Sequence, residues 1–173
     1  MDLRYPIGNF AWPSSVTAWD RERAMEEIAA APRLLREAVA GLGDAQLDTP
    51  YRPEGWTVRQ LVHHVADSHL NSYTRFRLAA TEHEPTIKPY DEKAWAELSD
   101  ARTAPVGLSL ALLDAMHARW TLLLGGFGPA EWSRAFRHPE RGLIRVDATA
   151  LLYAWHGRHH VAHVTELRRR EGW

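Results

Sequence analysis

The sequence contains no cysteine, and this absence excludes disulfide bonds, a thiolate nucleophile and any cysteine-ligated zinc site. Long apolar runs are missing as well, because charged residues interrupt every such stretch well short of the roughly 18 residues that a transmembrane helix needs. The first residues show no basic segment followed by an apolar one, as a signal peptide would. We therefore expect a soluble, cytoplasmic protein that does not enter a membrane.

An excess of charge of either sign is also lacking. The 21 basic and 22 acidic residues leave a formal net charge of −1, which gives no overall attraction to nucleic acid or to an anionic membrane. The 173 residues suit one domain, large enough to bury a core without disulfides. No internal repeat or low-complexity linker divides the chain, so we predict a single domain over residues 1–173 with no nucleic-acid partner.

The chain begins with a segment rich in proline, glycine and aromatic residues over residues 1–14. We expect an extended arm there, apolar enough to lie against the body of the protein or against a partner subunit. Ser15 is the expected N-cap of a helix over residues 15–31. Pro32 is expected to break or restart that helix, which then continues over residues 33–42.

A capping box of Thr57 and Gln60 marks the start of the next long helix, which the hydrophobic period extends to about residue 82. Asp147 is expected to cap a last long helix that ends near residue 170. The other predicted segments are loops over residues 44–56 and 83–89, a short helix capped by residues 91–93, a helix over residues 106–124 and a strand or hairpin arm within residues 142–146. Helices with almost no strand pattern predict an all-α bundle.

Histidine is abundant, and most of the ten histidines fall in two helical windows. The last helix contains the pairs His156/His160 and His159/His163. Residues four apart lie on one face of a helix, so either pair could bind one metal ion with two imidazoles. The spacing does not decide which of the two pairs does so. Gly157 between them costs roughly 1 kcal/mol relative to alanine, which is tolerated more easily where something approaches the backbone closely.

The capped helix supplies candidates for a third ligand. His69 lies within its apolar face, His63 lies nearly opposite, towards solvent, and His64 lies at the edge on a polar strip. This geometry favours His64 over His69 by a modest margin. The H-E-x-x-H pattern of zinc proteases is missing. Asp67 could act as a base or be merely exposed, so the sequence marks out no catalytic residue.

Two signatures give a family resemblance. The run Trp56-Thr57-Val58-Arg59 followed by His64 resembles the first signature of the DinB-like superfamily of four-helix-bundle metalloproteins, and His156-Gly157-Arg158-His159-His160 resembles the second. Within that superfamily the chain is similar to the YfiT group from end to end. The matching stretches include Tyr5-Pro6-Ile7-Gly8, residues 47–56, 63–69 and 89–95, and Ala162-His163-Val164-Thr165-Glu166-Leu167.

This resemblance implies a four-helix bundle of the DinB/YfiT type, with short extra helices and an extended N-terminal arm, that forms a homodimer. Carried over by position, it implies His64, His156 and His160 as ligands of one divalent zinc or nickel ion per subunit. The group has been described as metal-dependent hydrolases. Its best-understood relatives transfer groups onto low-molecular-weight thiols such as bacillithiol, or isomerise substrates with mycothiol.

Three imidazole ligands leave at least one coordination position open, as in catalytic zinc sites. That position can lower the pKa of a water molecule, which favours hydrolysis, or deprotonate a thiol, which favours S-transfer. We therefore expect a metal-dependent enzyme that acts on a small molecule, with a low-molecular-weight thiol as a candidate substrate. The alternative is a non-enzymatic dimeric scaffold whose histidines bind metal or serve the structure alone.

Overall fold

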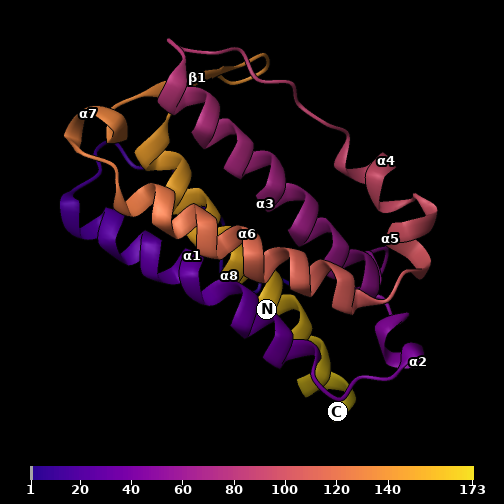
Figure 1. The fold of residues 1–173 in the computed structure, drawn as a ribbon. Helices are drawn as coiled ribbons and strands as arrows, with labels where there is room; N and C mark the ends of the chain where they lie inside the picture. Colours follow the sequence, from indigo (N-terminus) through magenta and orange to yellow (C-terminus); the bar gives the residue numbers. More distant parts are fainter. Residues whose placement is uncertain (1) are drawn as a thin grey trace.

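Four long helices dominate the computed structural model, which describes residues 2–173 (Figure 1). They are α1 (Ala18–Val39), α3 (Val58–Thr81), α6 (Val106–Gly125) and α8 (Val146–Glu171). Helix α1 packs against α6 and α8, and α3 packs against the same two helices, so the four surround a common core. The expected all-α four-helix bundle is confirmed.

Short elements connect the long helices. They are α2 (Asp44–Leu47), α4 (Glu92–Ala96), α5 (Ser99–Thr103), α7 (Pro129–Trp132) and the antiparallel strands β1 (Ala135–His138) and β2 (Gly142–Arg145). The expected strand near residue 142 and the short helix capped by Asp91 are both found. The expectation of a plain loop over residues 44–56 overlooked α2, a single helical turn.

Helix α1 differs from the sequence expectation at two points. Its N-cap is Thr17 rather than Ser15, because Thr17 and Asp20 form a reciprocal capping box. Pro32 neither breaks nor restarts the helix, which runs unbroken to Val39. Proline has no N–H to donate to the residue four positions earlier, so the carbonyl of Ile28 is left without its helical partner. Another helix supplies that partner, as described below.

Helix α8 begins earlier than expected. Arg145 is its N-cap, and Asp147 lies inside the first turn, where its buried carboxylate pairs with Arg145 and accepts a hydrogen bond from the Ala148 N–H at 2.7 Å. A negative charge is favourable in a first helical turn, so Asp147 stabilises this end without being the cap.

Close contact between α1 and α8 fixes the depth at which the last helix sits. A Cβ atom added at Gly157 would lie 3.0 Å from the Ala31 Cβ, which confirms that something approaches the backbone closely there. That neighbour is helix α1. The core around it is built from large, fully buried side chains, among them Trp120, Phe76, Ile28, Leu35, Leu61, Leu113, Leu124 and Leu167.

The N-terminal arm lies along α8, as expected. The Tyr5 ring approaches the ring of His159 at 6.0 Å between centroids, and Phe10 approaches Trp155 at 5.9 Å. Within residues 2–173, every helix is too short or too polar to cross a membrane.

Candidate metal centre

Three histidines from two helices meet in the bundle. His64 extends from α3, and His156 and His160 extend from successive turns of α8. One ring nitrogen from each lies within 4.8 Å of the others, and no other such group of three potential ligands is found among residues 2–173. The ring centroid of His64 lies 5.5 Å from that of His156 and 4.9 Å from that of His160. The structure thus brings together the three side chains that the resemblance selected.

Burial keeps all three rings uncharged. It lowers the pKa of His64 to about 4. Burial also lowers the pKa values of His156 and His160 well below the ordinary value, and the neighbouring histidines lower them further. A neutral imidazole has one nitrogen with a free lone pair, which is the form that binds a metal ion. The three rings are therefore ready to act as ligands at neutral pH.

The spacing of these nitrogens suits a metal ion. The Nε2 atoms of His156 and His160 are 3.1 Å apart. Two nitrogens that bind one tetrahedral zinc ion at about 2.0–2.1 Å stand about 3.3 Å from each other. The Nδ1 atom of His160 is buried and has no hydrogen-bond partner in the described part of the chain. The donor set, its neutrality and its spacing therefore fit a divalent transition-metal ion.

The three rings face a cavity of about 730 Å³. Aromatic side chains form part of its wall, including Trp56, whose ring centroid lies 4.7 Å from that of His64, and Trp155. Charged side chains from the N-terminal arm and from the loop before α3 also line it, among them Arg4 and Arg52. A cavity of this size accommodates a small organic molecule next to the histidines.

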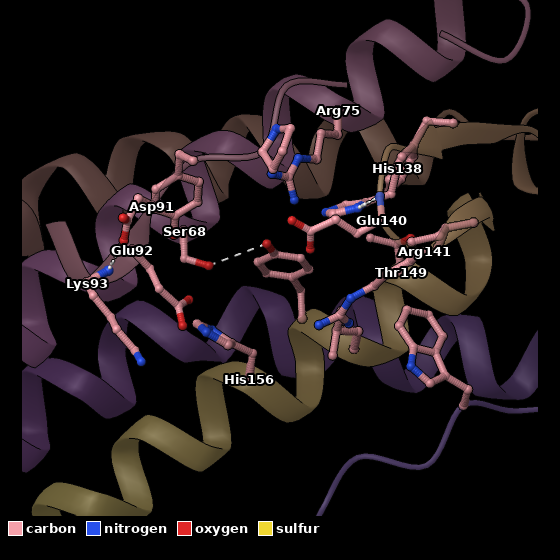
Figure 2. Close-up of a pocket in the computed structure, with 17 residues that line it drawn as sticks. Ser68, Arg75, Asp91, Glu92, Lys93, His138, Glu140, Arg141, Thr149 and His156 are labelled. Carbon is pink, nitrogen blue, oxygen red and sulfur yellow. Dashed lines mark hydrogen bonds between the residues drawn. The ribbon is translucent and has the colours of Figure 1, made fainter. Parts of the chain in front are cut away.

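A second cavity of about 440 Å³ is also lined by His156 and is shown in Figure 2. Its wall includes Ser68, whose hydroxyl lies 3.4 Å from the phenol oxygen of Tyr153, and the cations Arg75 and Arg141. The two cavities share the lining residues His156, Glu92 and Lys93, so both adjoin the histidine cluster.

Sequence reasoning missed Glu92 and Lys93 as functional candidates and treated them only as residues of a helix start. Figure 2 shows Glu92 extending from α4 towards His156. No local pattern relates residue 92 to residue 156, because the two residues line the same cavities only in the folded chain. Tyr153 could have been found, since it lies one turn before His156 and therefore on the same face of α8.

Asp67, the carboxylate that the sequence offered as a possible base, lines neither of the two cavities. It is half-buried, and burial together with the charge of Asp100 raises its pKa to about 6. Because Asp67 is absent from the walls of both cavities, we do not assign it a role in proton transfer at the histidine cluster.

The remaining histidines of the two windows occupy three different environments. His159 and His163 form a second pair, with Nε2 atoms 3.0 Å apart, but no third ligand joins them in the described residues. His69 is fully buried, as its place on the apolar face predicted. His63 was expected to face solvent, and this is wrong. It is buried because the start of α6 and the connection before it cover the ring, with Nδ1 2.7 Å from the Ser109 hydroxyl of α6 and Nε2 3.1 Å from the Ala104 carbonyl oxygen.

The fold and the site together define a helical-bundle protein with a histidine cluster that can hold a divalent ion between two helices. Residues 27–164 match the family model of the DinB superfamily. The chain belongs to that superfamily, and within it to the YfiT-like proteins.

Individual relatives match along their whole length. A protein of Bacillus mycoides (strain KBAB4), described as a "putative metal-dependent hydrolase", is 53% identical over 172 residues, which are 99% of each chain. YfiT of Bacillus subtilis (strain 168), named in the same way, is 48% identical over 174 residues, covering 100% of this chain and 98% of its own.

Two solved structures share the fold of this chain. The structure of Bacillus subtilis YfiT, described as "a probable metal-dependent hydrolase with an unusual four-helix bundle topology", has a TM-score of 0.97 and 48% identity, with 100% and 99% of the two chains covered. The four-helix bundle protein TT2238 shares the fold, with a TM-score of 0.55 and 20% identity over 88% of this chain and 99% of its own.

Proposed function

We propose that this chain is an enzyme that binds one zinc or nickel ion through His64, His156 and His160 and acts on a small molecule. The observation that carries the proposal is the arrangement of three neutral imidazoles, those of His64 and His160 buried and that of His156 half-buried, on the wall of a cavity of about 730 Å³. Three protein ligands leave a coordination position for a substrate, whereas structural zinc sites are usually closed by four. The names of the relatives, which describe metal-dependent hydrolases, support a divalent ion.

Transfer of a group onto a low-molecular-weight thiol is the reaction that the cavities support best. A divalent ion at the site would lower the pKa of a thiol bound beside the histidines. The sulfur then forms a bond to an electrophilic carbon of the second substrate, and the leaving group departs with its electron pair. Two organic molecules need two adjoining spaces, and the cavities of about 730 and 440 Å³ meet at His156. The chain has no cysteine, so the sulfur would come from the substrate.

Charged residues shared by the two cavities would handle the proton and the leaving group. Glu92 is placed to accept the proton that the thiol loses, because it extends towards His156 (Figure 2). Lys93 offers a positive charge to a leaving group or to an acidic part of the substrate. Trp56 and Trp155 add apolar surface to the wall, and charge interactions are stronger in less polar surroundings.

Hydrolysis is the second candidate, and the names of the relatives favour it. In that reaction Glu92 would be the base for a water molecule, and a single organic substrate would occupy one cavity. The two reactions therefore use the same ligands and the same carboxylate, and they differ in the nucleophile.

The metal assignment is tested by elemental analysis of the dialysed protein. We expect near-stoichiometric zinc or nickel in the wild type, and its loss on changing His64, His156 or His160 to alanine. His159→Ala and His163→Ala are matched controls, because they remove an i, i+4 pair from the same helix. Metal that survives the first three changes and disappears with the two controls would overturn the ligand assignment.

The reaction is tested with the metal-loaded protein, a fluorogenic alkyl halide and a panel of low-molecular-weight thiols, followed by esters and amides. Turnover that requires one thiol supports S-transfer, and turnover of esters or amides without any thiol supports hydrolysis. If neither kind of turnover is found, the result contradicts an enzymatic function and supports the non-enzymatic scaffold. Glu92→Gln is expected to lower kcat by about 10²- to 10⁴-fold, as for a lost general base. Glu22→Gln is the control, since Glu22 is exposed on α1 and lines neither cavity.

A further inference from the structure

A row of hydrogen-bonded histidines runs from His156 across the bundle. His156 Nδ1 lies 3.0 Å from His69 Nε2, and His69 Nδ1 lies 2.8 Å from His117 Nε2. His117 Nδ1 in turn lies 2.6 Å from the carbonyl oxygen of Ile28. The four residues come from α8, α3, α6 and α1, so each long helix contributes one group.

The row ends at the carbonyl oxygen of Ile28, which can accept a hydrogen bond but cannot donate one. The Ile28 carbonyl oxygen has no proton to give, so the Nδ1 atom of His117 must carry the proton that joins them. This carbonyl is available because Pro32 lacks the N–H that would otherwise bind it within α1. Pro32 thus creates the acceptor that fixes the direction of the row.

The direction is then transmitted from ring to ring, because each neutral imidazole has one N–H and one lone pair. With its proton on Nδ1, His117 accepts at Nε2 from the Nδ1–H of His69. His69 therefore accepts at Nε2 from the Nδ1–H of His156. The last ring is left with its lone pair on Nε2, the atom that lies 3.1 Å from His160 Nε2.

This hydrogen-bond pattern requires each imidazole to be neutral, and the surroundings of the rings favour the neutral form. His69 and His117 are almost fully buried, and a buried ring that gained a charge without a charged partner would cost several kcal/mol, on the order of the usual penalty for an unpaired buried charge. No carboxylate is hydrogen-bonded to either ring in the described residues, so no ion pair holds an extra proton in the row.

We propose that His69 and His117 are positioning residues, which hold His156 as the Nδ1–H tautomer and keep its Nε2 lone pair free for the metal ion. This inference rests on the proposed metal site. His160 has no comparable support, since its Nδ1 atom has no partner among the described residues. His156 is therefore the ligand that is prepared before the ion arrives. Histidine ligands commonly donate their second N–H to a carboxylate or a carbonyl, and here two further imidazoles connect that N–H to a carbonyl.

The direct test is a two-bond ¹⁵N–¹H NMR correlation spectrum of the metal-free wild type with ¹⁵N-labelled histidine, which distinguishes N–H from bare ring nitrogens. We expect His156, His69 and His117 all to be protonated on Nδ1 and bare on Nε2. A proton on Nε2 of His156 or His117 would overturn the proposal. This result depends neither on metal binding nor on a variant that folds.

Metal affinity supplies the second test, measured by competition with a chromophoric zinc chelator on folded variants. His69→Phe and His117→Phe are each expected to weaken zinc binding about 10- to 100-fold, the usual range for residues that support a ligand. His117→Gln is expected to restore most of the affinity lost in His117→Phe, because its amide oxygen can accept the His69 proton. His63→Phe is the matched control, since His63 is a buried histidine of the same helix bonded to Ser109 instead.

The outcomes separate this inference from the proposed function. Zinc affinity within about two-fold of the wild type in both Phe variants overturns the positioning role while the metal site stands. Equal losses in His63→Phe and His69→Phe show a general effect of the buried substitution and also overturn it. A wild type that binds no zinc overturns the metal site, and the NMR spectrum still decides the tautomers.

Discussion

Acid should unfold the metal-free protein, because the folded chain holds buried histidines in their neutral form. The pKa values of His64 and His117 are both lowered from 6.5 to about 4 by burial. In the unfolded chain these rings return to about 6.5, so below that pH the unfolded state binds more protons than the folded one. The stability that the neutral rings provide is intact above pH 6.5 and is lost progressively as the pH falls towards 4.

The size of the loss follows from the two pKa values. At pH 5, a histidine with a pKa of about 4 when folded and 6.5 when unfolded costs about 2 kcal/mol of the free energy of unfolding. His64 and His117 together therefore remove about 4 kcal/mol between pH 7.5 and pH 5. His69, His156 and His160, whose pKa values lie well below the ordinary one, increase this figure. The free energy of unfolding of a small domain is about 5–15 kcal/mol in total, so we expect the metal-free protein to unfold near pH 5.

The measurement is urea unfolding at pH 7.5, 6.5, 5.5 and 5.0 with a chelator present, followed by circular dichroism. In His64→Gln one titrating group is gone, so the loss between pH 7.5 and pH 5 should shrink by about 2 kcal/mol. His83→Gln is the control, since His83 is exposed in the segment after α3. A free energy of unfolding that changes by less than about 1 kcal/mol over this range would refute the reasoning.

Two further predictions concern packing and ion pairing. Gly157→Ala gains helix propensity but brings a methyl group to 3.0 Å from Ala31, so we expect a net loss of about 1 kcal/mol. Ala31→Gly in the same chain should relieve the contact, and a double-mutant cycle without coupling would contradict this explanation. Arg59 is buried and binds both Asp44 and Asp48, which secures α2 to α3. Arg59→Lys loses the forked geometry and should cost about 2 kcal/mol in urea unfolding, whereas a change below about 0.5 kcal/mol would contradict a structural role for the pair.

The sequence predicted the long helices well because their signals are local. The capping box of Thr57 and Gln60 places the start of α3 correctly, and the i, i+4 spacing places His156 and His160 on one face of α8. Pro32 was misjudged for a physical reason. The cost of a proline inside a helix is the loss of one hydrogen bond, and here a side chain from α6 replaces the lost donor.

The site was predictable only as far as helical geometry reaches. Spacing on α8 could not choose between its two histidine pairs, and the choice came from the family signatures. Contacts between helices decide the rest. His63 is buried because Ala104, before α6, and Ser109, in the first turn of α6, contact its ring. Glu92 lines the cavities because α4 packs against α3 and α5. The wheel of a single helix carries no information about either neighbour.

One physical property links the stability of the bundle to its proposed chemistry. Burial that keeps the imidazoles neutral leaves lone pairs ready for a metal ion, and it also makes protonation incompatible with the folded state. Protons and metal compete for the same nitrogens, so a bound ion should move the acid transition to lower pH. An ion present at about 1,000 times its Kd adds about 4 kcal/mol to the free energy of unfolding, which is close to the loss expected from His64 and His117 at pH 5. The metal-loaded protein should therefore remain folded at a pH at which the metal-free protein unfolds.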